Sequence, residues 1–176
     1  TRVEGNRIAV DAPLTCAIES QWGGGEIIPY SDSGRISQVG VENLRGESDF
    51  NRSVRTNKFG NMDRPDYTGF EYFSDEEHYW NFITIDNTCN AWVRDITALH
   101  FAFSTVFIGK GAKWVTVQDC TTIEPVSLSA GSRRFTFHIQ GQLSLVQRCV
   151  SDRGRHSFVV QNPTACGPNV FLDCIA

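Results

Sequence analysis

A short strand-like segment recurs along the chain, and its spacing is the strongest constraint on the fold. Its pattern is an apolar residue, usually a polar residue, usually Asp or Asn, and then an apolar residue or cysteine. The copies are Val41-Glu42-Asn43-Leu44, Val93-Arg94-Asp95-Ile96, Val117-Gln118-Asp119-Cys120, Val146-Gln147-Arg148-Cys149 and Phe171-Leu172-Asp173-Cys174. The steps between successive copies are 52, 24, 29 and 25 residues. A period in the twenties with one strand per period predicts a solenoid, in which each repeat stacks on the next.

A second short apolar strand precedes each of the later copies. These strands are expected at 82–85, 106–108, 137–139 and 158–160, and turn residues such as Asp86-Asn87 and Gly109-Lys110-Gly111 follow them. Strands joined by turns rather than by helices exclude β-α-β units. The sequence therefore predicts an all-β coil of stacked parallel strands with about five coils.

The chain of 176 residues is expected to form one β-helix domain over 1–176. Residues 1–35 are predicted to hold N-terminal strands, with a hairpin around Gly5-Asn6 and a further strand at 26–30. Residues 45–80 interrupt the repeat with an aromatic loop insertion, and 81–176 form regular coils. Because the chain stops inside a repeat strand, we expect a fragment of a longer helix whose open coil ends favour self-association.

Charge and hydropathy exclude two classes of partner. The net charge is -4 and the pI is about 5.5, whereas a nucleic-acid-binding protein needs a basic footprint, so no nucleic-acid partner is expected. No apolar run approaches the roughly 20 residues that span a bilayer, so no membrane partner is expected.

Three of the six cysteines occupy the same position in successive repeats. Cys120, Cys149 and Cys174 are expected to stack as small buried hydrophobic residues and to remain reduced. A disulfide among them is the alternative, and the state of Cys16 and Cys89 is left open with that of Cys166. No C-x-x-C pair is present, which argues against a zinc site.

The coil spacing, the strands of V-x-D-C type at Val117 and Phe171, and the cysteine ladder resemble the pectin-lyase-like right-handed parallel β-helix superfamily. The resemblance covers roughly residues 36–176 and implies a right-handed coil, a polysaccharide partner and a secreted or periplasmic bacterial protein. The superfamily includes polysaccharide lyases, glycoside hydrolases, esterases, epimerases and non-enzymatic adhesins. The chain lacks the R-x-P-x-x-R motif of pectate lyases and the N-T-D, G-H-G and R-I-K motifs of polygalacturonases, so no catalytic residue is carried over.

The repeat register predicts one row of polar side chains. The position seven residues after each first-position valine holds Ser48, His100, Glu124 and Arg153. In evenly stacked coils the last three would be outward-facing neighbours about 4.8 Å apart. Such a row is suited to proton transfer and anion binding. The alternative is a set of solvated loop residues that happen to align.

The segment 131–156 concentrates basic side chains in an acidic protein. It contains Arg133, Arg134, Arg148, Arg153 and Arg155, with His138 and His156. Because a guanidinium group matches a carboxylate bidentately, this segment is suited to carboxylated sugars. His138 alternates with Phe137 and Ile139, so we expect it to face outward. The alternative is a solubilising face whose arginines pair with the acidic loop.

Two features of the insertion are candidate ligand contacts. The run Asp75-Glu76-Glu77-His78 contains oxygen ligands suited to calcium. More often, however, such a run of charged residues is simply solvated. Tyr79 and Trp80 are candidates for stacking on sugar rings, or else they cover the side of the solenoid. No metal site is assigned, and no other cofactor is expected.

These observations lead to two hypotheses. In the first, the protein is a lyase or glycoside hydrolase that acts on a uronate-containing polysaccharide. His138, His156 or His100 would serve as the base of a lyase, and a hydrolase would pair Glu124 with Asp95 or Asp119. The substrate contacts would come from Arg133, Arg134, Arg153, Arg155, Trp80 and Tyr79. In the second, the chain is a non-catalytic carbohydrate-binding or structural module of a larger protein.

Overall fold

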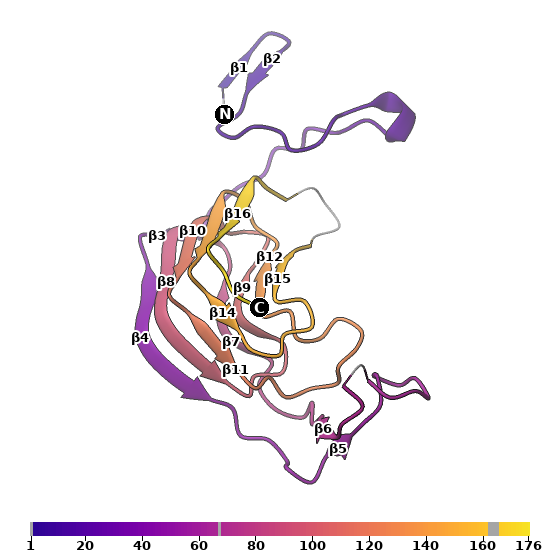
Figure 1. Cartoon of the computed structure of the whole chain (residues 1–176). Helices are drawn as coiled ribbons and strands as arrows, with labels where there is room; N and C mark the ends of the chain where they lie inside the picture. The colour runs from indigo at the N-terminus through magenta and orange to yellow at the C-terminus, as the bar shows by residue number, and fades with distance from the viewer. Residues whose placement is uncertain (1, 67, 162–165) are drawn as a thin grey trace.

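Parallel strands dominate the computed structural model, which describes residues 2–66, 68–161 and 166–176 (Figure 1). Within that part of the chain the only helix is a single 3₁₀ turn, Ser20–Trp22. The all-β architecture predicted from the repeats is confirmed. No helix in these ranges is long and apolar enough to cross a membrane.

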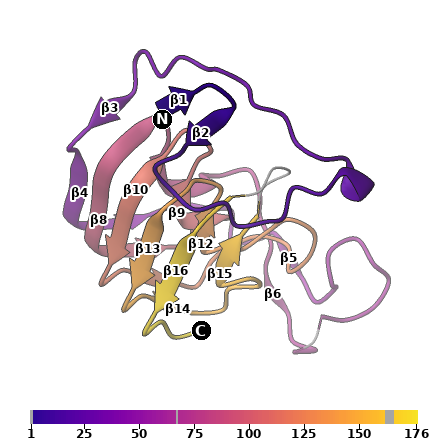
Figure 2. The same cartoon turned by 90° about the horizontal axis from the view of Figure 1, so that it is seen from above.

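The copies of the repeat form one large sheet, in which they pair side by side (Figure 2). Its order is β14 (Val150–Ser151), β11 (Thr121–Ile123), β8 (Thr88–Leu99), β10 (Lys113–Gln118), β13 (Ser144–Gln147) and β16 (Asn169–Leu172), and β3 (Ile36–Ser37) and β4 (Gly40–Glu47) also pair with β8. The ladders between repeats are parallel and bring the first residues of all copies into register: Val41 pairs with Val93, Val93 with Val117, Val117 with Val146, and Val146 with Phe171. The predicted register is therefore confirmed.

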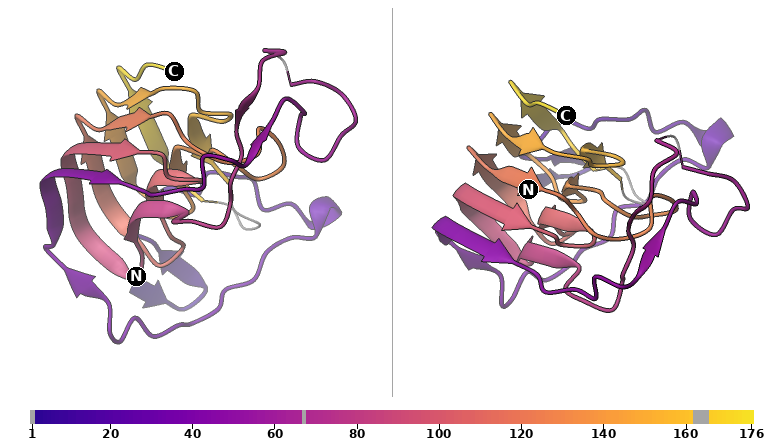
Figure 3. Two further views of the ribbon diagram at one scale, coloured as in Figure 1. Left: turned by 90° about the horizontal axis from the view of Figure 1, so that it is seen from below. Right: turned by 60° about the horizontal axis from the view of Figure 1, so that its bottom comes forward.

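The intervening apolar strands form a second parallel sheet. Its order is β15 (Phe158–Val160), β12 (Phe137–Ile139), β9 (Ser104–Ile108) and β7 (Asn81–Ile85). All four lie where the sequence predicted the second strand of each repeat. Figure 3 shows the segments of successive repeats layered one on another.

Every copy of the repeat places its third residue in the left-handed region of backbone conformation. The φ angles are 55° at Asn43, 53° at Asp95, 55° at Asp119, 50° at Arg148 and 51° at Asp173. In an uninterrupted strand the first and fourth side chains would point to opposite faces. The left-handed residue turns the chain between them, so both Val117 and Cys120 enter the core. Asn and Asp tolerate this conformation better than most residues, which explains their recurrence.

The core is contributed by both sheets. Val93, Val117 and Val146 of the large sheet meet Val106 and Phe137 of the small sheet in one buried cluster. Aromatic rings stack from layer to layer within it: the Phe137 and Phe158 ring centroids are 5.3 Å apart with an interplanar angle of 5°. Each layer therefore buries its apolar side chains against its neighbours, as expected of stacked repeats.

The cysteines are all free thiols, as predicted for the three in the repeats. Cys120 and Cys149 are buried in the core cluster, and Cys174 packs against it. A hydrogen bond with Cys120, together with burial, raises the pKa of Cys149. The three thiols act as small apolar residues at the fourth position of the repeat.

The N-terminal region and the insertion differ in part from the sequence expectation. The hairpin of β1 (Arg2–Glu4) and β2 (Arg7–Ala9) is confirmed, but 26–30 forms no strand because this exposed arm pairs with no sheet there (Figure 1). The repeat strand β4 runs to Glu47, so the insertion begins later than residue 45. Within the insertion, β5 (Arg55–Thr56) and β6 (Tyr72–Phe73) pair antiparallel.

We predict that the left-handed corner is sensitive to β-branched side chains. Asp95→Val is expected to lower the free energy of unfolding by about 1–2 kcal/mol, because its Cβ branches crowd the backbone at positive φ. Asp95→Gly should be tolerated. Equilibrium urea unfolding measures the stability of both variants. Thr116→Val, in the straight part of β10, is the matched control, and its free energy of unfolding should lie within about 0.5 kcal/mol of wild type. Equal stabilities of Asp95→Val and Asp95→Gly would contradict the proposed role of the corner.

Candidate functional site

A row of charged side chains lies along a second corner of the stacked repeats. His100, Glu124 and Arg153 all have left-handed backbones, with φ of 64°, 47° and 54°. His100 Nε2 is 3.7 Å from Glu124 Oε2, and a terminal guanidinium nitrogen of Arg153 is 3.2 Å from Glu124 Oε1. The predicted alignment of these three residues is confirmed. Ser48 does not extend the row outward, because it is buried and its hydroxyl is 2.8 Å from Nδ1 of His78.

His100 is the most enclosed member of the row. Its side chain is 13% exposed, against 49% for Glu124 and 64% for Arg153. Its Nδ1 lies 3.4 Å from the Glu47 carboxylate, without a hydrogen bond. The ring of Phe50 packs edge-on at a centroid distance of 5.1 Å. The imidazole is thus held between two carboxylates, an arrangement suited to proton transfer.

A cavity of about 220 Å³ separates this row from the β5–β6 hairpin of the insertion. Its lining includes three arginines (Arg55, Arg134 and Arg153), two glutamates (Glu71 and Glu124), Tyr72 and His100. We call this cavity the charged cleft. On the side of the insertion, Arg55 Nε pairs with Glu71 Oε2 at 3.0 Å. On the side of the row, Arg153 pairs with Glu124. Guanidinium groups in excess over carboxylates favour an anionic ligand.

Arg134 forms part of the wall of the charged cleft. It is buried, it donates to the Ser127 carbonyl oxygen at 2.6 Å, and its guanidinium lies 5.2 Å from the Tyr72 ring centroid. Tyr72 is fixed as well: its hydroxyl donates to the Lys58 carbonyl and accepts from the Ser129 N–H. Buried charges are retained where such contacts satisfy them. Arg134 therefore positions Tyr72 and the loop before β12.

Two other predicted substrate-binding arginines are engaged in structural contacts. Arg133 pairs bidentately with Glu76 at 2.7 and 2.9 Å, and this hydrogen bonding raises its pKa. Arg155 donates to the Gly131 carbonyl at 2.6 Å. Neither residue lines the charged cleft. Arginines of the basic segment 131–156 thus hold their own loop in place and bind the insertion. This agrees in part with the alternative in which these arginines pair with the acidic loop.

Tyr79 and Trp80 lie in a different hollow. They are 75% and 40% exposed, and their hollow of about 610 Å³ is also lined by four carboxylates (Glu47, Asp49, Glu76 and Glu77) and by His78. This concentration of negative charge opposes a carboxylated sugar. The structure therefore does not bring these two rings together with the arginines of the charged cleft.

The remaining predicted histidines lie away from the charged cleft. His138 faces away from the core, as predicted, but it is 4% exposed beneath aromatic side chains. Desolvation lowers its pKa. His156 is exposed and packs edge-on against Phe135 at 5.0 Å. Of the three histidines considered as a lyase base, only His100 lines the cleft.

Side chains of the acidic run in the insertion bind backbone and side-chain groups of the protein. The Asp75 carboxylate accepts from the backbone N–H groups of Asn51 and Glu77, and the Asn51 hydrogen bond above all holds its pKa below the ordinary value. Glu76 pairs with Arg133, and His78 contacts the Val126 carbonyl at 2.9 Å. In the described ranges no three His, Cys, Asp or Glu side chains are grouped as metal ligands. The carboxylates of Asp75 and Glu76 are thus engaged by groups of the protein itself.

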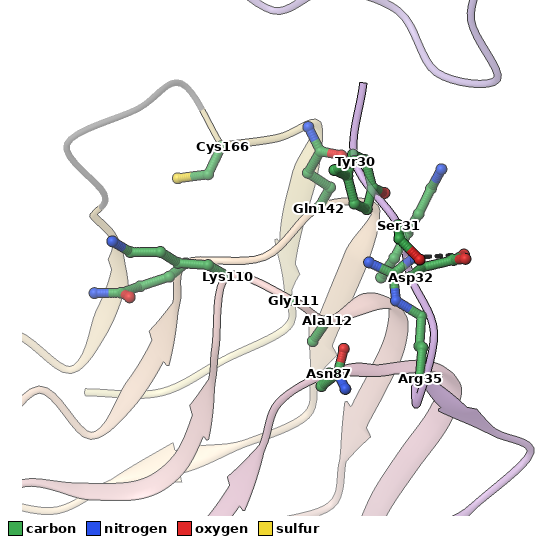
Figure 4. A pocket seen from close by; sticks show the side chains of 12 residues that line it. Tyr30, Ser31, Asp32, Arg35, Asn87, Lys110, Gly111, Ala112, Gln142 and Cys166 are labelled. Carbon is green, nitrogen blue, oxygen red and sulfur yellow. Dashed lines mark ion pairs between the residues drawn. The ribbon is translucent and has the colours of Figure 1, made fainter. Parts of the chain in front are cut away.

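A further hollow of about 430 Å³ lies where the N-terminal arm passes the turns between the sheets (Figure 4). Tyr30, Asp32 and Arg35 of the arm stand on one side, and Lys110 and Cys166 on the other. The sequence pattern identifies these turn residues only as connections between strands, and no motif in it indicates this hollow. Its charges are partly neutralised, since Arg35 pairs with Asp32 at 3.7 Å and Lys113 pairs with Asp11.

Comparison with known proteins gave no match, whether to protein-family models, to curated proteins or to solved structures.

We predict that the pair of Glu76 and Arg133 stabilises the folded protein at neutral pH and loses this contribution in acid. The hydrogen bond from Arg133 lowers the pKa of Glu76 from its ordinary value of 4.5 in the folded protein. The contribution is therefore complete above the unfolded pKa and is lost as the pH falls through the lower folded value. Glu76→Gln should reduce the free energy of unfolding by up to about 1 kcal/mol at pH 7, and the difference from wild type should shrink below pH 4.5.

Urea unfolding across an acid series measures this difference. Glu77→Gln is the matched control. The carboxylate of Glu77 is next to Glu76 in sequence, but it is exposed and makes no ion pair within the described ranges. A difference between wild type and Glu76→Gln that stays constant through the acid series would contradict the role assigned to the pair.

Proposed function

We propose that the chain is a right-handed parallel β-helix that acts on a uronate-containing polysaccharide through the charged cleft. Support for the coil comes from the parallel register of successive repeats and from the recurring left-handed corners. The observation that carries the functional proposal is the assembly of three arginines around His100 and Glu124 in one cavity. Guanidinium groups recognise carboxylates bidentately, which suits the acidic sugar.

In the lyase form of the proposal, arginines neutralise the uronate carboxylate and thereby acidify the C5 proton. His100 accepts that proton, the bond from C4 to the glycosidic oxygen breaks, and a double bond forms between C4 and C5 while the departing oxygen takes up a proton. His100 is the best-placed base because it alone among the candidate histidines lines the cavity. Arg153 is the best-placed carboxylate contact, since it is the more exposed partner in its pair with Glu124.

A hydrolase would need two carboxylates facing one glycosidic bond. Asp119 is unsuited to this role, because two hydrogen bonds from Arg148 at 2.7 Å engage it and lower its pKa. Neither Asp95 nor Asp119 lines the charged cleft, where Glu71 accompanies Glu124 instead. A hydrolytic mechanism would therefore use Glu124 and Glu71.

The second candidate is a non-catalytic carbohydrate-binding module that uses the same cleft. The observation in its favour is that carboxylates already engage two of the cleft arginines, Arg55 and Arg153. An incoming uronate would exchange with these carboxylates, which gives reversible binding without requiring a reaction.

A reaction screen on polygalacturonate and alginate tests the proposal, with ultraviolet absorbance reporting unsaturated products and a reducing-end assay reporting hydrolysis. We expect Arg153→Gln to weaken turnover or binding at least about tenfold, the equivalent of 1.4 kcal/mol. Arg148→Gln is the matched control, because Arg148 is also a corner arginine paired with a carboxylate of the preceding layer but lies outside the cleft.

The outcomes separate the alternatives. Rising absorbance identifies a lyase, and reducing ends without absorbance identify a hydrolase. Saturable binding without either signal identifies the binding module. Absence of both binding and turnover in the wild-type protein, or equal losses in Arg153→Gln and Arg148→Gln, would overturn the assignment of the charged cleft.

A further inference from the structure

A second candidate ligand site lies on the outer face of the small sheet. It is a hollow of about 460 Å³ whose lining includes Phe103, Phe107, Phe135, Ser132 and His138. None of its lining residues is charged, in contrast to the charged cleft. Aromatic rings dominate the lining, a composition typical of sites that bind small ring compounds.

His138 is one of four polar residues in the lining of this hollow, with Ser132, Gln140 and Gln161. It lies on β12 opposite Phe107 of β9, on the face turned away from the core residues Phe137 and Ile139. Its ring centroid is 5.7 Å from that of Phe103, 5.1 Å from Phe107 and 5.4 Å from Phe135. The side chain is only 4% exposed.

The two nitrogens of His138 have different surroundings. Nε2 lies 3.3 Å from the carbonyl oxygen of Gln161, which only accepts hydrogen bonds, so Nε2 carries the proton. Nδ1 is then the acceptor of a neutral imidazole, and it is buried without a hydrogen-bond partner. Desolvation lowers the pKa of His138 and so favours the neutral ring. A buried acceptor without a partner is unfavourable until a donor reaches it.

We propose that the aromatic hollow binds a neutral ring compound that carries a hydroxyl group. The ring packs on Phe103 and Phe107, and the hydroxyl donates to Nδ1 of His138 after the aromatic rings that bury this atom move aside. Both phenols and neutral sugars have this chemistry, since each combines an apolar ring face with a hydroxyl donor. A charged ligand is disfavoured, because no counter-charge lines the hollow. This inference does not rest on the function proposed for the charged cleft.

Calorimetric titration of the full chain with phenol, and separately with methyl β-glucoside, tests the proposal and distinguishes the two sources. We expect saturable millimolar binding of at least one probe. The ¹⁵N resonance of Nδ1 should shift on saturation, because that nitrogen gains a hydrogen bond. His138→Phe keeps a ring of similar size and removes the acceptor, so it should weaken binding at least tenfold.

Two further variants keep the test independent of the stability of His138→Phe. Ser132 is an exposed residue of the lining, so Ser132→Trp should fill the hollow and abolish binding without changing His138. Thr84→Ala is the matched control, because Thr84 pairs with Phe107 in the same sheet but lies outside the hollow. The proposal is overturned if neither probe saturates, if the Nδ1 resonance is unmoved at saturation, or if Ser132→Trp binds as wild type does.

Discussion

A single left-handed residue in each repeat is the constraint on which the structure depends. Without positive φ at the third position, the first and fourth apolar residues could not both enter the core. The same local geometry recurs at the corner of His100, Glu124 and Arg153, where it aligns side chains of successive layers on the surface. Core packing and the candidate site thus have one origin: parallel strands in register, turned at equivalent residues. The conformation is costly for ordinary side chains, which explains the preference for Asn and Asp at the third position. Arg148 departs from that preference, and its pairing with Asp119 stabilises it there.

The repeat made much of the scaffold predictable. The recurring four-residue pattern placed Val93, Val117 and Val146 opposite one another and set the second strands apart as their own sheet, because equivalent residues of successive repeats stack in such a fold. The prediction of a strand at 26–30 was wrong, because this segment lies outside the repeats. Local β propensity is effective only where a neighbouring strand offers a partner, and the N-terminal arm has none there.

The site was predictable only where it followed the register. The row of His100, Glu124 and Arg153 could be derived by counting, but the cleft it borders depends on the fold of the insertion, which has no period to count. Local composition also could not distinguish free arginines from tethered ones: Arg133 meets Glu76 from a segment 57 positions away in sequence. His138 shows the same limit. Alternation predicted its direction, but the Phe135 and Phe103 rings that bury it come from loops outside the strand.

The ion pairs around the charged cleft make its shape responsive to ionic strength. Arg55 with Glu71, Arg153 with Glu124, and Arg133 with Glu76 join residues of different loops and layers, and most of these side chains are partly open to solvent. Dissolved salt screens such pairs over a distance of about 8 Å at physiological concentration. Raising the salt concentration would weaken the pair of Arg133 with Glu76, which joins the insertion to the loop before β12. It would also weaken the attraction of the charged cleft for an anionic chain. The rigid coils beneath, held by apolar contacts and backbone ladders, would not respond in the same way. The ion-paired surface and the apolar scaffold therefore differ in how they respond to salt.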